Sequence, residues 1–303
     1  MIKIDGVSKK YENGVKSLDS VSMDIKRGSV LGLIGTNGAG KSTLLRIMSG
    51  IYKADEGEVF VDGERVFEND RIKGKIAYVS DEQYLIPHFT LVEMAGLYKR
   101  FFKDFSFEKF YEMCKNINLD VNRKISTFSK GMKRQGEVIL AISTMSDYLF
   151  FDETFDGLDP IARDFAKKAI AETVIENSRT VVLSSHNLTD IETICDSVSL
   201  IDGGKLVLHK SIDDILAGFH KYQMIFDKSV DDISFMDAFA TLAHKSGKLI
   251  TFISEENEDS VKKKMSAYLP DNTLVYSEAV ELTLDEIFTL EVERVKKERG
   301  DKE

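Results

Sequence analysis

The chain has 303 residues, of which 43% are hydrophobic and 30% are charged, and its formal net charge is −10. This length allows one large domain and a smaller one. The acidic balance, with no basic block, argues against binding to nucleic acid. No apolar run approaches the ~18–20 residues that span a bilayer, so the chain is not expected to cross a membrane by itself. Cys114 and Cys195 lack metal-site spacing and are expected to be reduced thiols.

Residues 29–48 predict a phosphate-binding loop between a strand and a helix. The apolar run 29–34 is typical of a buried strand, and Thr43–Met48 has helical spacing. Between them, GTNGAGKST matches the pattern G-x-x-x-x-G-K-[ST]. Lys41 is expected to reach the β- and γ-phosphates of a nucleotide, and Ser42 to ligate Mg²⁺. The nucleotide contacts expected from this loop are Asn37, Gly38, Ala39, Gly40, Lys41, Ser42 and Thr43.

The stretch from 87 to 146 is expected to be a helical insert. Near its end, Ser129 is predicted to cap a helix, which the apolar run 138–142 continues. Gly131 permits a close backbone approach, and Lys130 adds positive charge. The start of this helix is therefore suited to contact with a phosphate.

Two carboxylates follow the apolar run Tyr148–Phe151. Open α/β sheets bind ligands at the carboxyl ends of their strands, so Asp152 is expected to hold Mg²⁺. Glu153 is one residue further and points differently, so it is expected to face the attacking water as a general base. The core around these motifs is expected to comprise residues 1–86 and 147–216, in which strands alternate with helices around a mainly parallel sheet.

From about residue 220 the pattern changes. Strands are predicted over 222–226, 248–253 and 273–276, and a helix is predicted after each of them. These helices are expected over 235–244, 260–268 and 284–299. The β-α-β-α-β-α order predicts a small α+β accessory domain over 220–303, and its surplus of acidic residues again argues against nucleic acid.

Taken in this order, the motifs resemble those of the nucleotide-binding subunit of an ABC transporter, over residues 1 to about 210. In that family a Ser-x-Gly signature caps a helix and contacts the γ-phosphate of ATP held by the opposite subunit. Ser129 and Gly131 match it. Phe128, Lys130 and Met132 depart from the commonest Leu-Ser-Gly-Gly-Gln form, but Ser-Lys-Gly-Met is similar to the signature of exporter ATPases.

The resemblance implies further site residues. The segment 154–160 is similar to the D-loop that crosses the dimer interface, with Asp159 as its carboxylate. His186, after the strand predicted over 181–185, is similar to the switch histidine that senses the γ-phosphate and holds the catalytic water with Glu153. Tyr11 matches the aromatic residue that stacks on adenine.

One position departs from the family pattern. The strand predicted at Ile76–Val79 leads into the Q-loop, whose glutamine touches Mg²⁺ and the nucleophilic water. In this register the position is occupied by Asp81, while Gln83 lies two residues later. Asp81 could ligate Mg²⁺ and take the catalytic role, although clustered carboxylates repel one another. The alternative is that Gln83 takes this role through a shifted loop.

The resemblance implies an α/β fold, a P-loop NTPase core with a mainly parallel central sheet, an antiparallel β edge and a helical signature subdomain. It also implies ATP and Mg²⁺ as ligands, a second nucleotide-binding subunit in a homodimer or heterodimer, and a transmembrane permease subunit. The expected function is ATP hydrolysis that drives an ABC exporter, in the cytoplasm at the inner face of the membrane. The alternative is a soluble ABC ATPase with a regulatory or sensor role, and the sequence leaves the transported substrate open.

Overall fold

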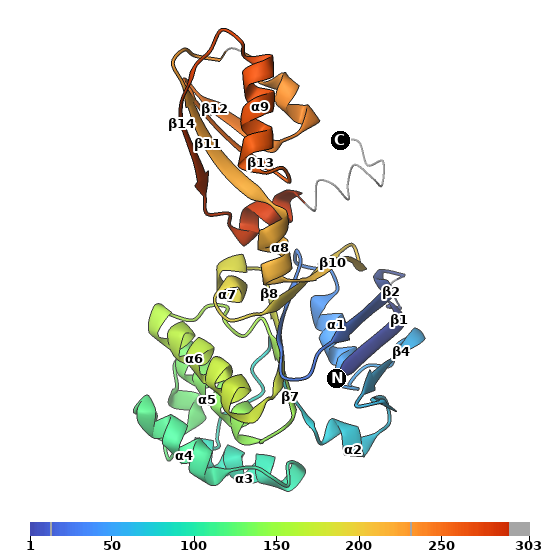
Figure 1. Ribbon diagram of the computed structural model, residues 1–303. Helices are drawn as coiled ribbons and strands as arrows, with labels where there is room; N and C mark the ends of the chain where they lie inside the picture. The colour runs from blue at the N-terminus through green and yellow to red at the C-terminus, as the bar shows by residue number, and fades with distance from the viewer. Residues whose placement is uncertain (13, 231, 291–303) are drawn as a thin grey trace. The chain divides into compact units, whose positions relative to one another are not determined.

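The computed structural model describes residues 1–12, 14–230 and 232–290. It divides into two compact units, Met1–His209 and Lys210–Glu303 (Figure 1). The division falls a few residues before the boundary predicted at 216. Within the described ranges, no helix is long and apolar enough to cross a membrane.

A six-stranded sheet forms the centre of the first unit, in the order β10-β9-β3-β8-β7-β6. Its strands are β3 (Val30–Ile34), β6 (Ile76–Val79), β7 (Tyr148–Asp152), β8 (Thr180–Ser185), β9 (Ser197–Asp202) and β10 (Lys205–Ser211). β3 pairs in parallel with β8 and β9, and β7 with β6 and β8. Every residue of β3, β7 and β8 is buried, as is typical of parallel strands covered on both faces. The predicted α/β class with a mainly parallel sheet is confirmed.

The first unit also contains an antiparallel sheet, in the order β2-β1-β4-β5. Its strands are β1 (Ile2–Lys10), β2 (Lys16–Ile25), β4 (Glu56–Val61) and β5 (Glu64–Arg65). Helix α1 (Lys41–Met48) contacts β2 of this sheet and β7 of the central sheet (Figure 1). Leu44 and Leu45 of α1 are fully buried in a core that includes residues of both sheets. One helix therefore joins the antiparallel edge to the parallel centre.

Four long helices of the first unit pack together, and two of them contact strands of the central sheet. They are α3 (Leu91–Phe101), α4 (Phe107–Asn116), α5 (Lys130–Ser143) and α6 (Pro160–Asn177), and the unit also has α2 (Asp70–Lys73), η1 (Ile125–Thr127) and α7 (Leu188–Glu192). Each of the four long helices begins at a side chain that accepts a main-chain N–H: Thr90, Ser106, Ser129 and Asp159. α5 lies at the centre of this layer, because it contacts α3, α4, α6 and β6.

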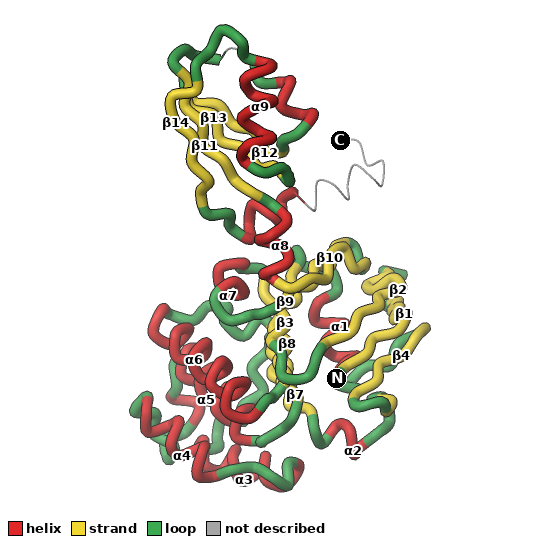
Figure 2. The backbone as a smooth tube through the Cα atoms, viewed as in Figure 1, coloured by secondary structure: helices red, strands yellow, loops and turns green. Residues whose placement is uncertain are grey.

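The second unit contains an antiparallel sheet in the order β12-β13-β11-β14, with α9 on one face (Figure 2). Its elements are α8 (Ile212–Gly218), β11 (His220–Phe226), η2 (Ser234–Ala238), β12 (Thr241–Ser246), β13 (Leu249–Ser254), α9 (Glu258–Tyr268) and β14 (Leu274–Val280). Tyr222, Met224 and Phe252 lie in the core of this unit. Residues 284–290 are helical, and the rest of the helix predicted over 284–299 lies outside the described residues.

The prediction of a helix over 235–244 is wrong. That stretch forms the short η2 and then β12, which pairs antiparallel with β13. The turn between the two strands contains Gly247, whose φ of 62° lies in the left-handed region that favours glycine. Pairing across this turn and burial of Met236 outweigh the helical spacing of the apolar residues.

Candidate functional site

The phosphate-binding loop leaves the buried strand β3 and enters α1. Gly40 precedes the first residue of α1 with a φ of 112°, and a Cβ there would lie 2.5 Å from the carbonyl oxygen of Ser17. Only glycine fits this position without a shift of the backbone. The ammonium group of Lys41 donates to the carbonyl oxygens of Gly35 (2.7 Å) and Thr36 (3.4 Å). The loop therefore folds around its own lysine.

Asp152 ends strand β7 and is fully buried. Its Oδ1 accepts hydrogen bonds from the hydroxyls of Ser42 (3.0 Å) and Ser184 (2.6 Å), and its Oδ2 accepts one from Tyr78 (3.0 Å). The structure thus brings the predicted Mg²⁺ ligands Ser42 and Asp152 together. Oxygen ligands of this kind suit Mg²⁺, so the residues present fit the ion that the sequence predicts.

Glu153 contacts both Lys41 and His186. Its Oε1 lies 3.0 Å from the Lys41 ammonium, and its Oε2 lies 3.0 Å from Nδ1 of His186. Its φ of 45° is unusual for a residue other than glycine. Strained backbone of this kind is concentrated at functional sites.

Asp156 adds a carboxylate that the sequence reasoning did not single out. Its Oδ2 lies 3.6 Å from Nδ1 of His186. Burial, and then the neighbouring charge of Glu153, raise the pKa of Asp156 above its usual value. One ligand atom from each of Glu153, Asp156 and His186 lies within 4.8 Å of the others. His186 is therefore held between two carboxylates.

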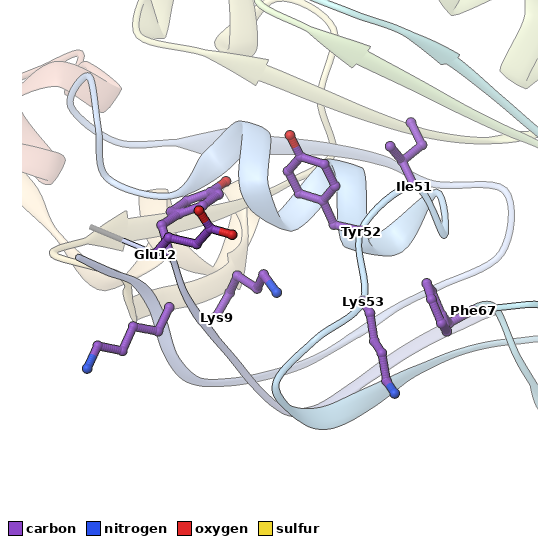
Figure 3. A pocket seen from close by; sticks show the side chains of 8 residues that line it. Lys9, Glu12, Ile51, Tyr52, Lys53 and Phe67 are labelled. Atoms are coloured by element: carbon purple, nitrogen blue, oxygen red, sulfur yellow. The ribbon is translucent and has the colours of Figure 1, made fainter. Parts of the chain in front are cut away.

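Tyr11 borders an open cavity of about 650 Å³, lined also by Lys9, Lys10, Glu12, Ile51, Tyr52, Lys53 and Phe67 (Figure 3). The Tyr11 hydroxyl lies 2.9 Å from Oγ1 of Thr43, and its ring meets that of Tyr52 edge to face, with centroids 6.5 Å apart. A cavity of this size with aromatic walls suits a small aromatic ligand. Thr43 links it to the phosphate-binding loop.

Asp81 and Gln83 lie on the irregular segment after β6 and make different contacts. The Asp81 carboxylate lies 3.1 Å from the guanidinium of Arg46 on α1. Burial alone would raise its pKa, but hydrogen bonds from Ser80 and from main-chain groups, together with the Arg46 charge, hold the pKa of Asp81 below its usual value. Gln83 donates instead to the carbonyl oxygen of Lys130 (3.2 Å).

Ser129, Gly131 and Asp159 form a separate group. Ser129 accepts from the main-chain N–H of Met132 at the start of α5, and Asp159 accepts from that of Ala162 at the start of α6. A Cβ on Gly131 would lie 3.6 Å from Oδ2 of Asp159. Among the described residues, no hydrogen bond joins this group to the phosphate-binding loop of the same chain.

Sequence reasoning missed four contributors to the site: Arg46, Tyr78, Asp156 and Ser184. Ser184 and Tyr78 stand near the carboxyl ends of β8 and β6, which flank β7 in the sheet. The rule that places ligands at that edge could have identified both. Arg46 and Asp156 have no comparable signal, because their roles depend on side-chain contacts across the fold.

A glycine-rich loop between a buried parallel strand and a helix, with a buried carboxylate at the end of a nearby strand, defines a P-loop NTPase. The family model described as ABC transporter matches residues 18–156. The uncharacterized ABC transporter ATP-binding protein YhaQ of Bacillus subtilis (strain 168) is 30% identical over 249 residues, 78% of this chain and 80% of that protein. The chain belongs to the family of ABC transporter ATP-binding proteins and is an ABC ATPase.

Other relatives extend this similarity. The ABC transporter ATP-binding protein YtrB of B. subtilis is 25% identical over 288 residues, 95% of this chain and 97% of that protein. The glycine betaine/carnitine/choline transport ATP-binding protein OpuCA of B. subtilis is 27% identical over 224 residues, 71% of this chain and 59% of that protein. A solved structure of the ATP-binding subunit of an ABC transporter superposes with a TM-score of 0.65 at 26% identity, covering 71% of this chain and 91% of that one.

Proposed function

We propose that the chain binds ATP with Mg²⁺ and hydrolyses it as one of two nucleotide-binding subunits of an ABC exporter. The observation that carries this proposal is a set of side-chain contacts between three segments that are far apart in sequence: the phosphate-binding loop, the end of β7 and the end of β8. Lys41 is bonded to Glu153, Glu153 is bonded to His186, and Asp152 is bonded to Ser42. A lysine for phosphate, a carboxylate for water and an oxygen site for a hard cation are the parts that phosphoryl transfer needs.

Each residue is proposed to take one role. Lys41 binds the β- and γ-phosphates, and the cavity beside Tyr11 takes the base. Ser42 and Asp152 would hold Mg²⁺, which when bound neutralises charge on the phosphates. Glu153 accepts the proton of the attacking water, and His186 fixes the orientation of the Glu153 carboxylate. Catalysis in this scheme is mainly positioning and charge stabilisation.

The second subunit completes the site. Ser129 and Gly131 stand at the N-terminus of the long helix α5, where main-chain N–H groups favour an anion. We propose that they serve the γ-phosphate bound by a partner in a head-to-tail pair, with Asp159 at the interface. The ATPase domain is proposed to span 1–216, and the accessory domain 220–303.

The partner in the membrane is proposed to be a transmembrane permease, which would hold the pair at the inner face of the membrane. The Ser-Lys-Gly-Met form at residues 129–132 supports export, whereas the similarity to OpuCA keeps uptake as the competing direction. Transport assays with the permease in inside-out and right-side-out vesicles distinguish the two. ATP-dependent accumulation in inside-out vesicles supports export, and accumulation in right-side-out vesicles contradicts it.

Steady-state ATPase activity measured against protein concentration tests the proposed pair. Specific activity is expected to rise with concentration, because each site needs residues from two chains. A flat and near-zero rate would mean that a different ATPase subunit completes the site, or that the chain is a non-transport ABC ATPase with a sensor role. Recovery of a permease with the tagged chain from solubilised membranes separates these two outcomes.

Asp81, not Gln83, is proposed to take the Q-loop role. Asp81→Ala is expected to lower kcat about 10-fold or more, because it removes the carboxylate that is proposed to contact Mg²⁺ and the attacking water. Gln83→Ala is expected to leave kcat nearly unchanged, since the Gln83 side chain bonds only a carbonyl of α5 among the described residues. The two variants are compared at saturating ATP and Mg²⁺; slowing of Gln83→Ala alone would show that the register is wrong.

A further inference from the structure

Helix α5 contains a buried ion pair that the proposed mechanism does not use. Arg134 and Glu137 are three residues apart, and their side chains are only 4% and 7% exposed. A guanidinium nitrogen of Arg134 lies 3.0 Å from Oε2 of Glu137. Taking two charges out of water is costly, and their attraction repays it only when further hydrogen bonds satisfy the remaining polar atoms.

Among the described residues, these further bonds go to one short segment, Ser80–Tyr84, while Nε of Arg134 is buried without a hydrogen-bond partner. Arg134 donates to the carbonyl oxygens of Ser80 (2.6 Å) and Asp81 (2.8 Å). Glu137 accepts from the main-chain N–H of Tyr84 (3.2 Å). The segment is irregular, so its main-chain groups lack partners from a helix or a sheet ladder. The planar fork of arginine can bond two successive carbonyls, which a lysine ammonium cannot match in geometry.

The same segment connects α5 with the nucleotide site. Its first residue follows β6, the neighbour of β7, and its Asp81 side chain reaches Arg46 on α1. At the other end, Gln83 donates to the carbonyl oxygen of Lys130, next to the signature residue Ser129. The ion pair therefore connects the helix that would contact the partner's ATP with the segment that carries Asp81, the residue proposed to act at the chain's own ATP.

We propose that Arg134 and Glu137 are positioning residues that clamp the segment Ser80–Tyr84 to α5, so that a displacement of α5 moves Asp81 relative to the site. This inference rests on the proposed function of Asp81 and adds the means by which its position is set. The main-chain carbonyl oxygen of Asp81 accepts from Arg134, and its side-chain carboxylate accepts from Arg46. A shift of the helix that keeps both contacts is therefore expected to move the main chain of Asp81.

The protonation state of Glu137 offers a test of the clamp. Burial raises the pKa of Glu137 to about 7, against the opposing charges of Arg134 and Lys133. Among the described residues, Glu137 also faces the Tyr84 main chain and Tyr98 of α3, whose own pKa is raised by burial and then by Glu137. Protonated Glu137 loses its charge attraction to Arg134, so the clamp is expected to loosen as the pH falls below neutral.

Two variants test the clamp. Arg134→Met combined with Glu137→Leu removes both charges together, which buried pairs often tolerate without loss of stability. Glu137→Gln keeps the shape and an acceptor for Tyr84 but cannot titrate. Glu112→Gln on α4, whose side chain is 56% exposed, is the matched control. Each variant is compared with the wild type for thermal unfolding, binding of a fluorescent ATP analogue, kcat, KM and hydrogen exchange.

The double variant is expected to unfold cooperatively and to bind the analogue as the wild type does, while amides of residues 80–86 exchange about 10-fold faster. Its kcat is expected to fall about 10-fold with little change in KM, because the loss is one of positioning. Glu137→Gln is expected to lack the inflection near pH 7 that the wild type shows in kcat. The control is expected to match the wild type in every measurement.

Unchanged exchange of residues 80–86 in both variants would overturn the clamp, and this measurement needs no active enzyme. If the double variant does not fold, Glu137→Gln decides alone: the same exchange and the same pH profile as the wild type would overturn the inference. Asp81→Ala, measured in parallel, separates the two proposals. If Asp81→Ala keeps the wild-type kcat, the proposed role of Asp81 is refuted. If Asp81→Ala lowers kcat while the double variant keeps the wild-type kcat, only the clamp is refuted.

Discussion

Glu153→Gln is expected to lower ATP hydrolysis by about 10²–10⁴-fold, the usual contribution of a general base, while ATP binding persists. Glutamine has the shape of Glu153 but cannot accept a proton from water. The change also removes the carboxylate partner of the buried Lys41 ammonium, which is then free to bind phosphate. With ATP and Mg²⁺ present, the variant is therefore expected to elute in size-exclusion chromatography as a dimer, because ATP hydrolysis no longer dissociates it.

Glu108→Gln is the matched control, because Glu108 is an exposed glutamate on α4 outside the site. It is expected to keep wild-type hydrolysis and to show no dimer that survives chromatography. A Glu153→Gln protein that stays monomeric under saturating ATP and Mg²⁺ would count against the head-to-tail pair. Hydrolysis at the wild-type rate would exclude Glu153 as the base.

The central part of the fold could be predicted from the sequence because each signal there is local. A run such as Tyr148–Phe151 is apolar throughout, and this is the pattern of a strand buried on both faces. The phosphate-binding pattern predicts that Lys41 and Ser42 begin a helix. The geometry of a parallel sheet then predicts that Asp152, at the end of its strand, lies beside them. The contact between Glu153 and His186 followed only from the family resemblance, because 33 residues separate them and no local pattern joins them.

The parts that escaped prediction depend on pairing between distant segments or on neighbouring side chains. The stretch 235–244 has apolar residues at helical spacing, yet part of it pairs with β13 and forms a strand. The buried pair on α5 escaped for a related reason. Arg134 and Glu137 lie three residues apart, as exposed ion pairs on helices commonly do, and only the fold shows that they face the segment after β6.

Lys41→Met is expected to weaken binding of a fluorescent ATP analogue by about 10–100-fold, the usual effect of losing a charge-assisted hydrogen bond, and to abolish measurable hydrolysis. The Lys41 side chain is 5% exposed and is the predicted contact to the β- and γ-phosphates. Lys3→Met is the control, since the Lys3 side chain is 52% exposed and pairs with Asp5 on β1. Binding of the analogue by Lys41→Met at wild-type affinity would contradict the assignment of the loop.

The same substitution can be used to measure how much the ion pair between Lys41 and Glu153 stabilises the protein in the absence of nucleotide. Lys41 must leave or share this carboxylate when a phosphate arrives, so the bond competes with ATP. In a double-mutant cycle of Lys41→Met and Glu153→Gln, denaturant unfolding is expected to give a coupling free energy of about 1–3 kcal/mol, as for other residues in direct contact. Effects that add to within about 0.5 kcal/mol would mean that the 3.0 Å contact contributes no net stability. Nucleotide binding would then meet no opposition from the Glu153 carboxylate.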